Sequence, residues 1–258
     1  MKKSNYYAIL ALVLGAVCFG LRRWQMASDF DALGLPVPGA ATWALAGVAA
    51  LSLALFVALL LPLEGASRWD AVLGERKLTP LYGGALLFAA ALVPMLRVRG
   101  GDIDDVAVFV VAAKVIPMLM MLGTVLTAVG LCFAASGGAL RGQNLVLPTL
   151  LGCFWTVGAY HDHGTDPVIG HFLWLILAVV SSTMAWYELT GLSMNRGHAR
   201  RAFFLCLCSE LFSLTALAGG ASLPEMLLLA AQTVSLFTVA MAMGQGFREN
   251  GKQGNGTE

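Results

Sequence analysis

Apolar residues fill eight long stretches of the chain, and polar residues lie mainly in the short segments between them. The apolar stretches run approximately over residues 6–22, 41–63, 80–97, 107–134, 143–160, 168–191, 201–219 and 223–245. A helix of about 20 apolar residues crosses a hydrocarbon core of roughly 30 Å. Inside lipid every backbone polar group must be bonded within the protein, and the alternating pattern of barrel strands is absent from this sequence. The pattern therefore predicts an all-α integral membrane bundle of about eight transmembrane helices.

Composition agrees with a chain that lies almost entirely in a bilayer. Hydrophobic residues make up 58% and charged residues 12% of the chain, about half the charged share of a soluble domain. No connecting segment is long enough to fold alone, so residues 1–245 are predicted to form a single polytopic membrane domain. The polar residues 246–258 are predicted to be a disordered cytoplasmic tail. The lipid bilayer is the partner this composition implies, and a net charge of +1 gives no argument for nucleic acid.

The distribution of Lys and Arg predicts the orientation of the bundle. With the N-terminus inside, only Arg22, Arg23, Arg97 and Arg99 fall in outer segments, and eleven other Lys and Arg residues fall in inner ones. Short cytoplasmic loops carry an excess of these residues. We therefore expect both termini inside (N-in and C-in) in a multi-pass protein of a bacterial cytoplasmic membrane. The tryptophans lie mostly near span boundaries, which is typical of an interfacial belt.

The fourth apolar stretch is longer than a bilayer requires and contains Lys114 and Pro117. One interpretation is an interfacial lead-in over residues 104–116, followed by a span that Pro117 kinks. The other is a single long, tilted helix. The sequence favours the lead-in but leaves both open.

Ionisable residues inside the apolar stretches are the main candidates for function. A charge at mid-bilayer costs about 2.5–3.5 kcal/mol on insertion scales, so Glu210, in the middle of the seventh stretch, is the clearest case. Gln232 lies at a similar depth in the eighth, and Lys114 is a candidate counter-charge. His171 and Glu188 share one face of the sixth stretch. These residues predict a path for a solute or ion. The alternative is packing, with a protonated Glu210 hydrogen-bonded to Gln232 or to a hydroxyl group, so that two helices are held together.

Three of the four histidines gather near one predicted membrane boundary, at His161, His163 and His171. Imidazole and carboxylate ligands suit Zn, Ni or Fe, so a metal site is one interpretation. The favoured alternative is a solvated turn in which Asp166 caps the sixth helix. No cofactor is predicted, because P-loop, Rossmann, HExxH, GxSxG and CxxC motifs are all absent from the sequence.

Capping residues mark the predicted start of the last helix. Ser222 and Glu225 are spaced as in a capping box, with Pro224 near the first turn. This signal locates a helix start and implies no chemistry.

Short motifs in two outer segments carry a resemblance. Arg23-Trp24-Gln25 with the run over residues 34–39 (GLPVPG), together with Thr165-Asp166-Pro167, resembles a group of uncharacterised polytopic membrane proteins of Firmicutes, chiefly Clostridia. The resemblance implies a helical membrane protein and supplies no activity or site.

Three functional hypotheses follow. The preferred one is a non-enzymatic membrane protein that binds or passes a small solute or ion through a polar bundle interior. The alternative is a structural or sensory subunit that acts through a membrane protein partner. The third is a metal-dependent membrane enzyme that uses His161, His163 and His171.

Overall fold

The described part of the chain folds into eight α-helices. The computed structural model describes residues 6–30, 37, 39–61, 63, 73, 78–98, 107–136, 143–163 and 169–254, with side chains except at 97–98, 107–114, 161–163, 169–171 and 248–254. The helices are α1 (Tyr6–Ser28), α2 (Ala40–Leu60), α4 (Leu81–Val98), α5 (Ala107–Ser136), α6 (Val146–His163), α7 (Ile169–Ser193), α8 (Ala199–Leu217) and α9 (Leu223–Gly254), and a short 3-10 turn, η2 (Gln143–Leu145), precedes α6. Each predicted apolar stretch overlaps one of these helices, which confirms the all-α prediction.

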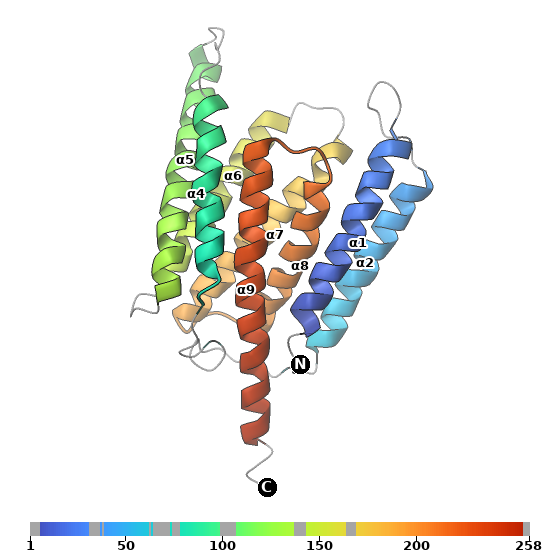
Figure 1. Ribbon diagram of the computed structural model, residues 1–258, viewed down its shortest axis with the longest axis vertical. Coiled ribbons are helices and arrows are strands. Elements are labelled where there is room, and N and C mark those ends of the chain that lie inside the picture. Colours follow the sequence, from blue (N-terminus) through green and yellow to red (C-terminus); the bar gives the residue numbers. More distant parts are fainter. Residues whose placement is uncertain are drawn as a thin grey trace.

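Six of the helices pack in a closed ring, and a helical hairpin lies against its side (Figure 1). Around the ring α4 packs on α5, α5 on α6, α6 on α7, α7 on α8, α8 on α9, and α9 returns to α4. The hairpin of α1 and α2 packs on α8. Because α8 contacts α1, α2, α7 and α9, its side chains are buried on nearly every face.

The surface of the bundle is suited to lipid. Five helical segments are long and apolar enough to cross a membrane: Tyr6–Ser28, Ala40–Leu60, Val115–Ser136, Phe172–Ser193 and Leu223–Phe247. A shorter apolar helix covers Leu81–Leu96. Large apolar side chains stand out from these helices; Trp43 and Leu86 are each 72% exposed. Exposed apolar side chains in this number are typical of a surface that is buried in lipid or against another protein, so the chain has the properties of a multi-pass membrane protein.

The first helix is longer than the sequence predicts. The apolar stretch ends at residue 22, yet α1 continues to Ser28. Arg22 and Gln25 on this last part are both buried and hydrogen-bonded to each other. Arg22 was predicted in an outer segment between helices, but it belongs to a packed helix, where its Nη1 donates a hydrogen bond to Gln25.

The last helix also extends beyond its predicted end. We predicted a tail from residue 246, whereas α9 continues to Gly254 and projects below the bundle in Figure 1. Phe247 is 9% exposed and its ring lies 5.8 Å from that of Phe203 in α8. This aromatic contact holds the first turn of the extension on the bundle.

The fourth stretch forms one long helix. α5 is continuous from Ala107 to Ser136 with Pro117 inside it. Over Ala107–Ser136 the chain thus forms one long helix, as in the second interpretation; an interfacial position for its first part stays a prediction. The side chain of Lys114 lies outside the described residues.

Glycines mark the closest helix contacts. A Cβ on Gly15 of α1 would lie 2.6 Å from Cδ1 and 3.1 Å from Cβ of Leu214 in α8. A Cβ on Gly84 of α4 would overlap the hydroxyl of Ser235 in α9. Small residues that let helices approach this closely are typical of packing within membranes.

Candidate functional site

The candidate site is the set of buried polar side chains on α8 and α9. Ser209, Glu210 and Ser213 of α8 are each 0% exposed, and Gln232 and Ser235 of α9 are 1% and 0% exposed. Among the described residues none of these three α8 side chains has a hydrogen-bond partner for its side-chain oxygens. A buried polar group without a hydrogen-bond partner costs about 1–3 kcal/mol of stability, so this cluster destabilises the fold.

Glu210 lies at the junction of three helices. At about 100° per residue it is rotated only about 20° from Phe203 and about 40° from Leu214 on α8. The ring of Phe203 is 6.3 Å from that of Tyr7 in α1 and 5.8 Å from that of Phe247 in α9. The carboxyl therefore faces the seam where α8 meets α1 and α9. The buried residues Ala8 and Ala11 on the facing side of α1 have methyl side chains, which offer no hydrogen bond.

Gln232 is bonded to a different helix. Its Oε1 accepts a hydrogen bond of 2.5 Å from Nε1 of Trp186 in α7, and its Nε2 has no partner within the described part of the chain. The Glu210–Gln232 hydrogen bond of the packing interpretation is therefore not formed. Trp186 and Trp155, 0% and 2% exposed, lie inside the bundle; for these two the expectation of an interfacial belt is wrong.

Glu188 and Lys114 are not brought to Glu210 by the fold. Oε2 of Glu188 accepts a long hydrogen bond of 3.4 Å from the backbone N–H of His198, the residue before α8. Glu210 lies about 18 Å further along α8. Lys114 belongs to α5, which packs on α4, α6 and η2, whereas α8 packs on α1, α2, α7 and α9. The packing of these helices gives no support to a Lys114–Glu210 pair.

The predicted metal ligands cannot be placed. The side chains of His161, His163 and His171 lie outside the described residues, and so does Asp166. Among the residues that are described, no group of three or more His, Cys, Asp or Glu side chains is arranged to hold a metal ion.

A polar network at the end of α1 was missed by the sequence analysis. Nη1 of Arg22 donates to Oε1 of Gln25 (2.6 Å), and Nε2 of Gln25 donates to Oγ1 of Thr42 in α2 (2.9 Å). Both the backbone N–H and the hydroxyl of Thr42 donate to Oδ2 of Asp29 (2.7 Å each), and the hydroxyl of Ser28 donates to Oδ1 (2.7 Å). Its only signal in the sequence is the spacing of Arg22, Gln25 and Asp29 along one helix face.

Asp29 acts as a distant cap for α2. Gly39 precedes that helix and has no side chain to offer its free N–H groups, so the Asp29 carboxylate accepts from Thr42 in the first turn. Hydrogen bonds from the side chains of Thr42 and Ser28 are the main reason the pKa of Asp29 lies below its ordinary value. The two helices of the hairpin are thereby fixed to each other at this end.

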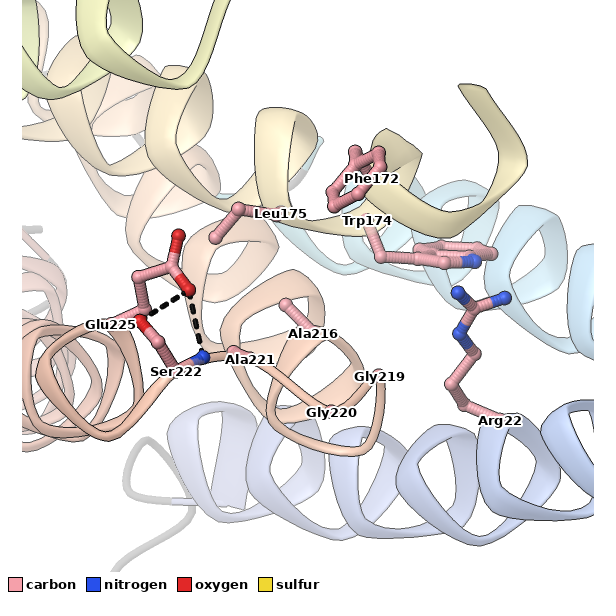
Figure 2. A pocket seen from close by; sticks show the side chains of 10 residues that line it. All are labelled: Arg22, Phe172, Trp174, Leu175, Ala216, Gly219, Gly220, Ala221, Ser222 and Glu225. Atoms are coloured by element: carbon pink, nitrogen blue, oxygen red, sulfur yellow. Dashed lines mark hydrogen bonds between the residues drawn. The ribbon is translucent and has the colours of Figure 1, made fainter. Parts of the chain in front are cut away.

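A cavity of about 190 Å³ lies beside this network, where the α8–α9 turn meets the start of α7 and the end of α1. Its lining is Arg22, Phe172, Trp174, Leu175, Ala216, Gly219, Gly220, Ala221, Ser222 and Glu225. Figure 2 shows the guanidinium of Arg22 next to the indole ring of Trp174, with Glu225 on the other side of the cavity. Oε2 of Glu225 accepts from the backbone N–H (2.8 Å) and hydroxyl (2.7 Å) of Ser222. This confirms the capping pair predicted at the start of α9.

Comparison with known proteins gives no match. No family model, no curated protein and no solved structure matches the chain. The resemblance to membrane proteins of Firmicutes stays a prediction, and the functional argument rests on the residues themselves.

Proposed function

We propose that this protein binds or passes a small solute or ion in the membrane, and that Glu210 is the group that takes up and releases a proton or a small cation. The observation that carries the proposal is the burial of Glu210: the side chain is 0% exposed, and both of its oxygens lack a hydrogen-bond partner among the described residues.

Energetics favour this interpretation over packing. A carboxyl that joins two helices should be held by a hydrogen bond, and interhelical hydrogen bonds in membranes average about 0.6 kcal/mol. Glu210 makes no such bond to Gln232, so no interhelical hydrogen bond to that residue offsets the unfavourable free energy of burying its carboxyl group. A Leu at this position would fill the seam more cheaply, because an isolated buried polar group is unfavourable. An ionisable residue kept in a membrane helix at a cost is a functional site by default.

The neighbours of Glu210 suit a proton or a small cation. Ser209 and Ser213 flank it on α8, and both hydroxyl oxygens are buried. Hydroxyl and carboxylate oxygens are hard ligands, of the kind that bind hard cations. A carboxyl this deeply buried is expected to be neutral at rest, because an isolated buried charge is far more costly than a neutral acid.

The proposal includes the orientation read from the sequence. Eight spans with both termini inside place the α8–α9 turn and Arg22 at the outer side. The excess of Lys and Arg in the segments at the other side supports this placement in a bacterial cytoplasmic membrane.

The test is ion movement in vesicles that contain the purified protein. We expect a pH gradient or a sodium or potassium gradient to drive a flux in the wild type, and Glu210→Gln to abolish it. Glu188→Gln is the matched control, since it removes a carboxylate of α7 that lies near the start of α8, far from Glu210, and it should keep the flux. Glu210→Gln should unfold no more easily than the wild type. Absence of flux in the wild type, together with clear destabilisation by Glu210→Gln, would support the packing alternative instead.

A further inference from the structure

The connection between α7 and α8 carries a cluster of basic side chains, which we call the basic turn: Arg196, His198, Arg200 and Arg201. Arg196, His198 and Arg201 are exposed to the outside of the bundle. Arg200 is half-buried and donates a hydrogen bond to the backbone carbonyl of Leu63, just beyond the end of α2. The basic turn is therefore a charged surface, separate from the buried set around Glu210.

The backbone of the basic turn is fixed on the end of α7. The backbone N–H of Arg196 donates a hydrogen bond of 2.8 Å to the carbonyl of Gly191. Asn195 lies in the left-handed region with φ 58°, which reverses the chain within a few residues. A Cβ on Gly197 would overlap the backbone of Leu192, so Gly197 lies directly against α7. Its neighbours on both sides are exposed, and the turn holds their side chains at a defined place.

The charge of the basic turn is only partly balanced. Oε2 of Glu188 accepts a hydrogen bond of 3.4 Å from the backbone N–H of His198, which places one carboxylate beside the turn. Three guanidinium groups against this one carboxylate leave an excess of positive charge among the described side chains. A guanidinium is planar and presents a fork of donors that matches the oxygens of a phosphate group.

An exposed apolar stripe on α7 leads to the basic turn. Val180, Met184, Tyr187 and Met194 recur at helical spacing along one face, and all four are exposed. Tyr187 lies about 9 Å before the end of α7, and tyrosine is enriched where a membrane meets water. Tyr6, also exposed, begins α1 at the same end of the bundle (Figure 1). The basic turn therefore lies just beyond the apolar surface, at the depth of lipid head groups.

We propose that the basic turn binds the head group of an anionic phospholipid. The phosphodiester lies at Arg196 and Arg201, and the acyl chains lie along the stripe from Val180 to Met194. The continuity of the charged turn with this apolar stripe favours a phospholipid over a free phosphate ion, which would use the charges alone. Basic clusters at a membrane boundary attract anionic lipids. The proposal is independent of ion exchange at Glu210.

Competition binding of phosphatidylglycerol to the purified full chain in neutral detergent tests the proposal. The probe is phosphatidylglycerol with a fluorophore on one acyl chain, followed by fluorescence anisotropy. Unlabelled phosphatidylglycerol should displace it. Phosphatidylcholine with the same chains should displace it at least tenfold less well, because its head group carries a balancing cation. Inorganic phosphate at the same concentration should not displace it; full displacement would assign the turn to free phosphate and overturn the proposal.

Charge variants separate head-group binding from general attraction to the bundle. A basic residue near a membrane surface changes the affinity for anionic lipid about fivefold, so the double variant Arg196→Gln, Arg201→Gln should bind at least tenfold more weakly. Both side chains are exposed, so circular dichroism should show an unchanged fold. Arg23→Gln is the matched control, because it removes an exposed arginine near the end of α1, and it should leave the affinity unchanged.

Glu188→Gln gives a test of opposite sign. It removes the carboxylate beside the basic turn, so binding of phosphatidylglycerol should become stronger, by up to about fivefold. Damage to the turn would instead weaken binding, and that result would contradict the proposal. Equal affinity for phosphatidylglycerol and phosphatidylcholine, unchanged affinity in the double variant, or an equal loss in Arg23→Gln would each overturn it.

Discussion

Trp186 of α7 and Gln232 of α9 are joined by a hydrogen bond of 2.5 Å, and both side chains are almost fully buried. Among the described residues Trp186 is the donor to Oε1 of Gln232, and Nε2 of Gln232 has no partner. Replacing Trp186 with Phe removes that donor. Stranding a buried amide costs about 1–3 kcal/mol. In membranes such bonds measure about 0.6 kcal/mol on average and about 1.7 kcal/mol at most. We therefore expect a coupling energy of about 1 kcal/mol between the two side chains.

A double-mutant cycle isolates this term. Gln232→Leu removes the unmet Nε2 together with the bond, so it should cost less free energy of unfolding than Trp186→Phe. The double variant should cost less than the sum of the two single variants, because it leaves neither group stranded. The assay is reversible unfolding of the purified protein in mixed micelles, followed by tryptophan fluorescence and circular dichroism.

Trp155→Phe is the control for the loss of ring volume. Trp155 is 2% exposed and makes no comparable bond within the described residues. Trp186→Phe should therefore cost more than Trp155→Phe. If the two costs are equal, or if the cycle is additive within about 0.5 kcal/mol, the bond does not contribute to stability and the reasoning is wrong.

Two further predictions concern the hairpin of α1 and α2. Hydrogen bonds from Thr42 and Ser28 lower the pKa of Asp29 in the folded state, so the ionised carboxylate stabilises the fold. This stabilisation is complete above the ordinary aspartate pKa of about 3.9. It is lost as the pH falls through the lower pKa that Asp29 has in the folded state. Thermal unfolding measured against pH should show this acid loss in the wild type and not in Asp29→Asn; equal profiles would contradict it. Gly15→Ala should destabilise the α1–α8 seam by about 1–3 kcal/mol through overpacking against Leu214, whereas Gly20→Ala, with nothing within 4 Å of the added Cβ, should be neutral or stabilising in the same assay.

The apolar pattern predicted the position of every helix in the described part of the chain, but not where two of them end. A run of apolar residues indicates the part of a helix that is buried in lipid or in the protein core. α1 continues past that run because Arg22 and Gln25 are hydrogen-bonded to each other and Gln25 is hydrogen-bonded to Thr42 of α2. α9 continues because Phe247 packs on Phe203. Contacts between residues far apart in the chain decide both ends, and a local pattern does not contain them.

The candidate site was predictable only in part. An acid in the middle of an apolar stretch indicates burial, and Glu210 is indeed buried; its role stays a prediction. The partner of Gln232 was not predictable, because it depends on how α7 and α9 are rotated toward each other. Arg22 was misplaced because an arginine directly after an apolar run usually lies in a loop, and only the packed hairpin shows its buried bonds.

The central claim is that Glu210 exchanges a proton or cation rather than packing two helices together. Infrared spectroscopy of the reconstituted protein tests it most directly, through the carboxyl stretching band that is present in the wild type and absent in Glu210→Gln. We predict a band of a neutral carboxyl that shifts after transfer to D2O while the bundle stays folded, and that decreases when the pH is raised or a bound cation replaces the proton. A band that neither exchanges in D2O nor responds to pH or cations would show a sealed carboxyl and contradict the account.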